Sequence, residues 1–495
     1  MFRRSPKIFF VFLGLTAAVL GFDACGTAHD KTYVVVCFDV EDYITPAEEG
    51  IDEIPKWLAE IMSEEGVPGT FFVIGEKARS LEERGRADVI AAMAQHDIAS
   101  HTDLGSIHPT VTEILEDAAW EEGLRTMLKQ EQRGFRELER IFGRHGNTLG
   151  RHGGSYGPQL VAALAEMGAG FVYSPVRLPG HNAVWFCNAL NFHGSYGGFD
   201  DTYYRDDLFE PRFAELQDRF PADIAGLDVL AFFAAHPCKI RTIQFWDINY
   251  YRGANPGPED WKMPELRPAA SMQTAQKNFR SLMQYLKGRD DIELTTFADL
   301  MQRYSFQRPD ISRRELGRIV EKIREENRIV IDAYYSAGEI FDGVVEYLAQ
   351  YKESGELPGA VDRFSPFGPL QMPPVQPEID EITLGQALSL AQEADIYLHE
   401  HNHLPARLAV EGGIIGTGSM LALFCEVFAA LSTGNPPDRF PVISFEAYPH
   451  DNEEPIIRSV EGSKGWPVHR DDLDMSHLIE MTRLQLWTLK PASIR

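Results

Sequence analysis

Cysteine is scarce in this chain of 495 residues, which contains only five. Five cysteines are too few for a disulfide scaffold in a chain of this length. No two of them have CxxC spacing and none clusters with histidine, so the sequence does not predict a structural zinc site. Cys37 and Cys425 each lie in an apolar run, and we expect both thiols to be buried and unreactive.

Basic residues are also in the minority. The chain has 47 lysines and arginines against 74 aspartates and glutamates, for a formal net charge of −27. A surface of this sign repels phosphate backbones and anionic lipids, which argues against nucleic acid or an anionic membrane surface as a partner. The charge balance does not restrict a neutral substrate.

The N-terminus carries an apolar run that is short for a transmembrane helix. Two arginines and a lysine precede residues 8–20, a pattern typical of a signal peptide. Residues 26–28 are small and offer a cleavage site, while Cys25 weakly resembles a lipoprotein site. We therefore predict that residues 1–28 are a signal peptide or lipoprotein signal, with an uncleaved anchor as the alternative. The predicted location is periplasmic, extracellular or lipid-anchored.

Apolar strand-like runs alternate with amphipathic helical segments over the first 300 residues. This alternation predicts an α/β fold with a parallel sheet, closed or open, and with loops at the carboxyl ends of its strands. Residues 177–228 are irregular and rich in glycine and aromatic residues, and we expect a long loop or an inserted subdomain there. Strands are predicted near 34–40, 70–74, 97–100, 171–173, 229–235 and 292–296, and helices near 54–65, 81–95, 112–142, 160–167 and 272–286.

The last third of the chain differs in character. Gly338 recurs as Gly385, and Leu357-Pro358 recurs as Leu404-Pro405, both at an offset of 47 residues. We interpret this register as a possible tandem repeat of helical hairpins. Residues 310–495 are therefore predicted to form a separate, mainly helical domain.

Acidic residues and histidines follow the predicted strands. Asp39, Glu41 and Asp42 end the first strand, and His101 and His108 flank a turn after the third. Acids in such places are mostly solvated, but α/β folds place their chemistry at the carboxyl ends of strands. Two imidazoles, one carboxylate and an open position are the usual ligands of a catalytic zinc or a similar divalent ion.

Three ordered motifs resemble the polysaccharide deacetylase family, also described as the NodB homology domain. The resemblance covers about residues 31–306 and implies a distorted (β/α) barrel that acts on chitin, peptidoglycan or a related glycan. The motifs are Phe38-Asp39-Val40-Glu41-Asp42, Val67-Pro68-Gly69-Thr70-Phe71-Phe72-Val73 and His96-Asp97-Ile98-Ala99-Ser100-His101-Thr102.

The resemblance implies a divalent metal, zinc first, bound by His101, His108 and one of two acids. Asp39 and Glu41 share one face of an extended chain and Asp42 faces the other way, which favours Glu41 as the ligand. Asp42 stays a candidate because the strand can bend at this point. The metal would lower the pKa of a bound water molecule.

Four residues receive catalytic roles from the same resemblance. Asp39 is expected to act as the general base, His236 as the general acid, and Arg151 as the residue that orients the base. The backbone N–H of Tyr156 is expected to stabilise the oxyanion.

The chain also departs from the family pattern. Its histidines His101 and His108 are seven residues apart, where the family has a spacing of four, so the turn between them is longer. The proline that normally follows the motif arginine is replaced by Gly153-Gly154.

We therefore expect an exported, metal-dependent deacetylase that removes N-acetyl groups from an amino sugar polymer or wall glycan. One alternative is hydrolysis of another non-peptide C–N bond, as in allantoinase-like relatives. The other alternative is an inactive carbohydrate-binding protein. Residues 310–495 are expected to bind a cell-wall polymer or to cap the cleft, and the sequence does not predict an oligomeric state.

Overall fold

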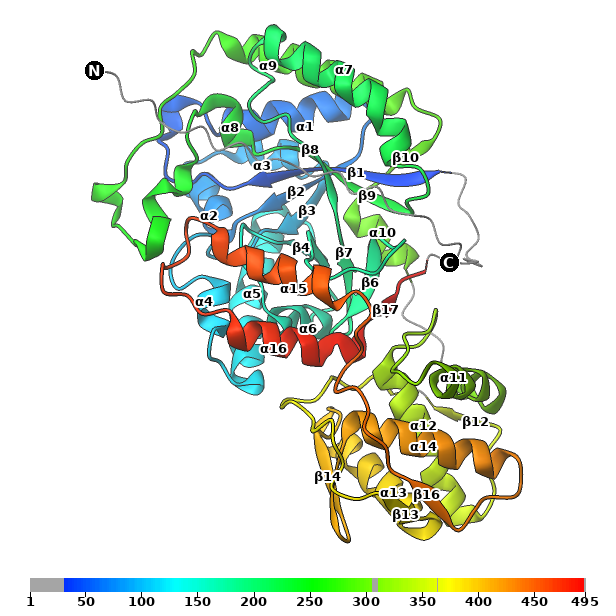
Figure 1. Cartoon of the computed structure of the whole chain (residues 1–495). Coiled ribbons are helices and arrows are strands. Elements are labelled where there is room, and N and C mark those ends of the chain that lie inside the picture. Colours follow the sequence, from blue (N-terminus) through cyan, green and yellow to red (C-terminus); the bar gives the residue numbers. More distant parts are fainter. Residues whose placement is uncertain (1–30, 305–309, 363, 494–495) are drawn as a thin grey trace, which may run out of the picture.

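The computed structural model describes residues 31–304, 310–362 and 364–493. They form a larger α/β unit and a smaller, mainly helical unit (Figure 1). The predicted signal segment, residues 1–28, lies outside the described residues. Within the described part, no helix is both long enough and apolar enough to cross a membrane.

A mainly parallel sheet forms the centre of the larger unit, as predicted. Its strand order is β17-β6-β7-β5-β4-β3-β2-β1-β9-β8, and β10 also pairs with β1. The two end strands do not pair with each other in the described chain, so the sheet is an open, distorted barrel. The strands are β1 (Thr32–Val40), β2 (Gly69–Val73), β3 (Asp97–Ser100), β4 (Thr148–Gly150), β5 (Gly170–Val172), β6 (Ala183–Phe186), β7 (Ala189–Phe192), β8 (Ser195–Gly197), β9 (Val229–Ala235), β10 (Ile292–Leu294) and β17 (Lys490–Pro491).

Strand β1 is buried along all nine residues because β2 and β9 flank it in parallel. Successive side chains point to opposite faces of a strand. Val34, Val36 and Phe38 accordingly enter the core between the sheet and its outer helices, whereas Val35 and Cys37 enter the core on the other face. Asp39 and Glu41 continue the second series, which directs both carboxylates towards the inner face of the sheet.

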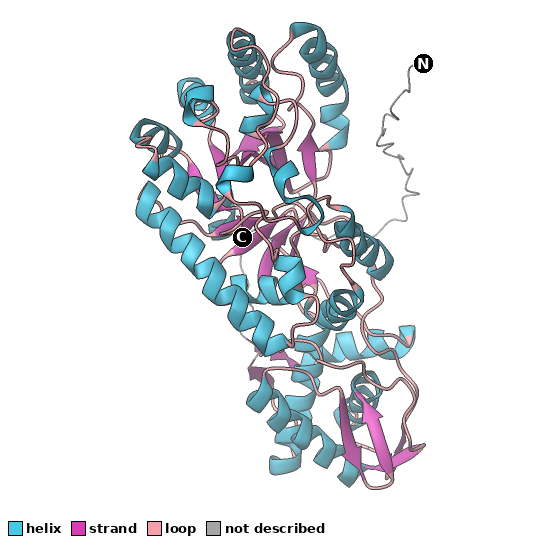
Figure 2. Cartoon of the chain, turned by 90° about the vertical axis from the view of Figure 1, so that its left-hand side faces the viewer, coloured by secondary structure: helices cyan, strands magenta, loops and turns pink. Residues whose placement is uncertain are grey.

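Helices cover the outside of the sheet, and Figure 2 shows the strands enclosed between them. Two predicted helices, 81–95 and 112–142, are each divided in two. Gly85 interrupts the first of them with a φ of 67°, a conformation that glycine adopts without strain. The four resulting helices are α2 (Gly75–Glu83), α3 (Ala87–Met93), α4 (Val111–Leu115) and α5 (Trp120–Phe142); the others are α1 (Glu53–Glu65), α6 (Pro158–Glu166), α7 (Asp206–Asp223), α8 (Pro237–Arg241), α9 (Ser271–Lys287) and α10 (Phe297–Arg303).

Residues 177–228 are more regular than the sequence predicts. They contain the antiparallel pair β6–β7, the strand β8 and the helix α7. Pro211 and Pro221 lie inside α7, and prolines in a sequence normally argue against a helix. That composition explains why the helix was not predicted.

The smaller unit packs four helices around a core of its own (Figure 1). The helices α12 and α13 each have 18 residues, and each begins with a capping box. The strand that follows α12 is β12, which pairs with β11, whereas the strand that follows α13 is β14, which pairs with β15. The predicted tandem repeat is therefore not confirmed. The elements are α11 (Arg313–Glu326), α12 (Ala337–Ser354), α13 (Leu384–His401), α14 (Thr417–Ser432), β11 (Asp310–Ser312), β12 (Ala360–Asp362), β13 (Glu381–Thr383), β14 (Arg407–Val410), β15 (Gly413–Gly416) and β16 (Arg439–Pro441).

The end of the chain returns to the larger unit. Helices α15 (Glu453–Gly462) and α16 (Ser476–Gln485) lie against it in Figure 1, and β17 pairs with β6. Val460 and Leu478 share one buried core with Leu160 of α6. The sequence predicted that residues 310–495 form one separate domain, but these last elements belong to the core of the first. The hydrophobic pattern of α15 and α16 predicts burial without showing which core receives them.

Candidate functional site

Five predicted or newly found polar residues meet at the carboxyl ends of four parallel strands. Asp39 is the penultimate residue of β1, Glu41 comes directly after that strand, and His101 comes directly after β3. His152 follows β4, and His236 follows β9. Parallel strands bring their carboxyl ends to one edge, so residues far apart in the sequence become neighbours.

Glu41 lies at the centre of the cluster. Its Oε1 is 3.1 Å from Nε2 of His101 and 3.3 Å from Nδ1 of His152, and its Oε2 accepts a hydrogen bond of 2.9 Å from the indole N–H of Trp246. Burial alone would raise the pKa of Glu41, but His152 and His101 outweigh it and hold that pKa well below its usual range. Glu41 is therefore ionised in the folded chain.

In both histidines, the ring nitrogen that faces away from Glu41 lies within hydrogen-bond distance of another residue. Nδ1 of His101 lies 2.9 Å from the carbonyl oxygen of Gly150, and Nε2 of His152 lies 2.9 Å from Oγ of Ser106. A carbonyl can only accept, so Nδ1 of His101 donates its proton to Gly150 and Nε2 is the nitrogen that faces Glu41. Burial lowers the pKa of His101, but Asp39 and Glu41 outweigh it and raise that pKa, so a cation bound at Nε2 would take the place of a proton. This arrangement fixes ring orientation in the way that outer partners of metal-binding histidines do.

The donor atoms of Glu41, His101 and His152 fit a divalent ion. All three residues are buried, and one ligand atom from each lies within 4.8 Å of the others. Ligands about 2.0–2.1 Å from a tetrahedral zinc ion are roughly 3.4 Å from one another. The separations of 3.1 and 3.3 Å from Glu41 are close to that value.

Asp39 lies beside this cluster. Its Oδ2 is 3.6 Å from Nε2 of His101 and 3.7 Å from Nε2 of His236, and its Oδ1 is buried without a hydrogen-bond partner in the described chain. Burial raises the pKa of Asp39 to about 6, although His101 and His236 act in the opposite direction. A carboxylate with this pKa is ionised at neutral pH and can accept a proton.

His236 is paired with Asp200, a residue that the sequence analysis did not identify. Nδ1 of His236 lies 2.9 Å from Oδ2 of Asp200, and the backbone N–H of His236 donates to Oδ1 at 2.7 Å. Burial lowers the pKa of His236, but Asp200 and Glu41 outweigh this and raise it to about 10. The imidazole is thus protonated at neutral pH. Asp200 lies in the 177–228 region, where no motif spacing pointed to it.

The structure does not bring His108 into the cluster. Its Nδ1 lies 2.7 Å from Oε2 of Glu113, and its Nε2 lies 2.9 Å from the carbonyl oxygen of Tyr250. His152 occupies the position that was expected for this second histidine. It directly follows Arg151, so the sequence signal was present in the arginine motif and not in the spacing of the histidines.

Asp42 also lies outside the cluster. Its carboxylate accepts hydrogen bonds from the backbone N–H groups of Ile44 and Thr45 and from the Thr45 hydroxyl. Such local bonds are typical of an Asx turn. Of the two acids that the sequence left open, Glu41 is the one that faces the histidines.

Arg151 and Tyr156 are not joined to the site as expected. Nε and Nη1 of Arg151 are buried without a hydrogen-bond partner among the described residues, so neither nitrogen is bonded to Asp39. The backbone N–H of Tyr156 donates to Oγ1 of Thr112 at 2.9 Å, so it is not free for an oxyanion. The tyrosine hydroxyl lies 3.2 Å from Oγ1 of Thr482.

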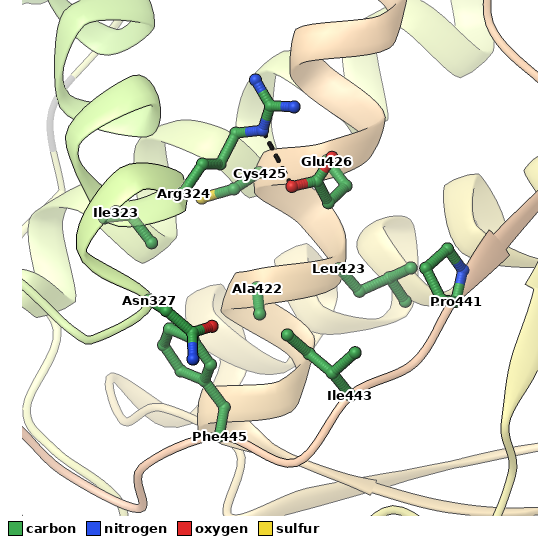
Figure 3. Close-up of a pocket in the computed structure, with 10 residues that line it drawn as sticks. All are labelled: Ile323, Arg324, Asn327, Ala422, Leu423, Cys425, Glu426, Pro441, Ile443 and Phe445. Atoms are coloured by element: carbon green, nitrogen blue, oxygen red, sulfur yellow. Dashed lines mark hydrogen bonds and ion pairs between the residues drawn. The ribbon is translucent and has the colours of Figure 1, made fainter.

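A separate cavity of about 200 Å³ lies in the smaller unit (Figure 3). Its rim carries an ion pair between Arg324 and Glu426 at 2.8 Å. Burial raises the pKa of the Cys425 thiol, which stays protonated at neutral pH and is a poor nucleophile. No histidine or aspartate lines this cavity, so it does not offer the set of acid, base and metal-binding groups found at the edge of the larger sheet.

No family model matches the chain, and no curated protein does. Solved structures do match. A protein from Mycobacterium smegmatis described as a polysaccharide deacetylase is 17% identical, with 58% of this chain and 93% of that one covered, at a TM-score of 0.34. A probable polysaccharide deacetylase from Pseudomonas aeruginosa is 11% identical, with 55% and 91% covered and a TM-score of 0.36. The Puue allantoinase is 12% identical, with 55% and 89% covered and a TM-score of 0.36. These TM-scores are low, so the chemistry of this chain is assigned from the residues of the site alone.

Proposed function

We propose that this chain is a metal-dependent hydrolase of a non-peptide amide bond and that it removes N-acetyl groups from an amino sugar. The observation that carries the proposal is the convergence of Glu41, His101 and His152 on one buried point. Asp39 and His236 stand beside that point, one suited to accept a proton and the other to donate one. Hydrolysis of an amide requires both transfers.

Glu41, His101 and His152 would hold the divalent ion. Two nitrogens and one oxygen are a usual protein ligand set of catalytic zinc. When bound, such an ion would polarise the carbonyl group of the substrate and lower the pKa of a bound water molecule.

Asp39 would accept the proton of the attacking water. Its carboxylate is next to the cluster, with Oδ2 3.6 Å from Nε2 of His101, and its Oδ1 makes no hydrogen bond among the described residues, which leaves it able to take up a proton. The carbonyl carbon then gains the bond to the water oxygen as the proton moves to Asp39.

His236 would donate its proton to the amine as the C–N bond breaks. Asp200 fixes the ring through Nδ1 and stabilises the imidazolium, which leaves the proton on Nε2 directed towards Asp39 and Glu41. The amine and the carboxylic acid are the products, and the proton on Asp39 restores His236 for the next cycle.

The N-acetyl substrate is supported by the ordered motifs around Asp39 and His101. Export is proposed from the sequence of residues 1–28 alone, and binding of a wall polymer by the smaller unit is likewise a proposal. Hydrolysis of a cyclic ureide would use the same groups, so the assay must separate the two substrate classes.

The test is release of acetate from chitooligosaccharides and from peptidoglycan by the purified chain, with allantoin as the comparison substrate. We expect acetate release that stops on chelation and returns with Zn²⁺. Hydrolysis of allantoin alone would reassign the substrate class. If the chain binds no ion and hydrolyses none of the three, the proposed function is wrong.

A further inference from the structure

A segment from the far end of the chain lies across the proposed metal site. The ring of Trp466 meets the imidazole of His152 edge to face, with centroids 5.2 Å apart and planes at 86°. The ring of His469 also contacts the Trp466 ring, with centroids 5.0 Å apart and planes at 83°. Nε2 of His152 is bonded to Ser106 and its ring also packs against His101, so Trp466 adds a further restraint to a ring whose Nδ1 faces Glu41.

Gly153 and Gly154 make room for this segment. A Cβ atom on Gly153 would lie 2.2 Å from Cε2 of Trp466, and its φ of +50° disfavours other residues as well. A Cβ atom on Gly154 would lie 2.6 Å from the carbonyl oxygen of Ser463 and 2.7 Å from Cε1 of His469. The glycine pair that replaces the proline after Arg151 therefore has a structural reason, which is the close approach of the C-terminal segment.

Hydrogen bonds from two other parts of the chain hold the segment around Trp466, residues 466–470, in place. On one side, the backbone N–H of Arg470 donates to Oε1 of Glu113 at 3.1 Å, and the other oxygen of Glu113 binds His108. On the other side, the backbone N–H groups of Arg252 and Gly253 donate to the carbonyl oxygens of residues 467 and 468 at 2.9 and 3.0 Å. Those two donors end the helical turns η2 (Trp246–Gly253), which begin with the tryptophan that binds Glu41.

We propose that Trp466 is a positioning residue for the metal site: it holds His152 in the orientation that directs Nδ1 at the ion. This inference rests on the proposed function, because it assumes that His152 is a ligand. It makes the C-terminal segment part of the site even though Trp466 and His152 lie 314 positions apart in the sequence. The role of His108 also becomes clear, since it helps to anchor this segment through Glu113.

The test uses the full chain and compares W466A, W466L and W466F with the wild type. Affinity for Zn²⁺ is measured by competition with a chelator, and the Co²⁺-loaded proteins are compared by visible absorption, which reports the ligand geometry. Loss of a residue that orients a metal ligand typically lowers metal affinity about 10–100-fold. We expect that loss and an altered Co²⁺ spectrum in W466A and W466L, with both largely restored in W466F.

L478A is the matched control, because Leu478 is buried in α16 and does not belong to the cluster around His152. It should lower Tm by weakening the C-terminal segment while leaving Zn²⁺ affinity within about threefold of the wild type. The role of Trp466 would be overturned if W466L kept the wild-type Zn²⁺ affinity and Co²⁺ spectrum. It would also be overturned if L478A, at a Tm similar to that of W466L, lost as much Zn²⁺ affinity as W466L. A wild-type chain that binds neither ion would instead refute the proposed function, and this inference with it.

Discussion

Replacing each of two histidines separates the metal site seen in the structure from the one that the sequence predicted. His152→Ala removes a nitrogen that lies 3.3 Å from Oε1 of Glu41, inside the proposed ligand set. His108→Ala removes a ring whose nitrogens bond to Glu113 and to the carbonyl of Tyr250, outside that set. Only the first change should alter metal binding.

The size of each effect follows from these contacts. Loss of an outer partner costs about 10–100-fold in metal affinity, so loss of a ligand itself should cost at least about 100-fold, or roughly 2.7 kcal/mol. His108→Ala leaves Glu113 with the N–H bonds of Thr110 and Arg470 but deprives it of the imidazole. The cost is about 1–3 kcal/mol of folding free energy. Each kcal/mol corresponds to a decrease in Tm of about 2–4 °C in a domain of this size.

Both variants can be measured by chelator competition with Zn²⁺ at one fixed pH, with Tm recorded for the metal-free proteins. The expected result is weak binding by His152→Ala and binding within about threefold of the wild type by His108→Ala. If His108→Ala loses as much affinity as His152→Ala, or if His152→Ala loses none, the assignment of the ligands is refuted.

Three other predictions follow from the structure. Asp39→Asn should bind Zn²⁺ as the wild type does but lower the rate of acetate release by about 10²–10⁴-fold, and equal rates would remove Asp39 from its role as base. Burial raises the pKa of Asp342 from 3.8 to about 8, so the folded chain holds this proton more tightly than the unfolded one and stability falls as pH rises from about 4 to about 8. Asp342→Asn should therefore raise Tm more at pH 9 than at pH 4, by calorimetry, and an equal change at both values would contradict this. If residues 310–495 formed a separate domain, as the sequence predicted, a fragment ending at Tyr304 would fold alone. Because its core includes α15 and α16, we expect this fragment to aggregate in size-exclusion chromatography; a monomeric fragment that unfolds cooperatively would contradict this.

The sequence could predict those parts of the site that depend on local pattern. The dense apolar run of β1 predicted a buried strand, and its period of two placed Asp39 and Glu41 on one face. His101 and His236 each follow a strand directly, so their positions at the sheet edge were also predictable.

The rest depended on contacts between distant residues. The turn after His101 includes two residues with positive φ, Thr102 and Gly105, and it carries His108 away from the sheet edge. Asp200 reaches His236 from a region without a recognisable pattern. No local signal could show that Trp466 packs on His152, because the glycines that permit the contact are explained only by the folded chain.

The most direct test of the metal site is anomalous diffraction at the zinc absorption edge from crystals grown with Zn²⁺. We expect one strong peak about 2.0–2.2 Å from a carboxylate oxygen of Glu41, from Nε2 of His101 and from Nδ1 of His152. A peak next to His108 would contradict the assigned ligands. So would the absence of a peak at Glu41, if the same protein needs zinc to hydrolyse its substrate.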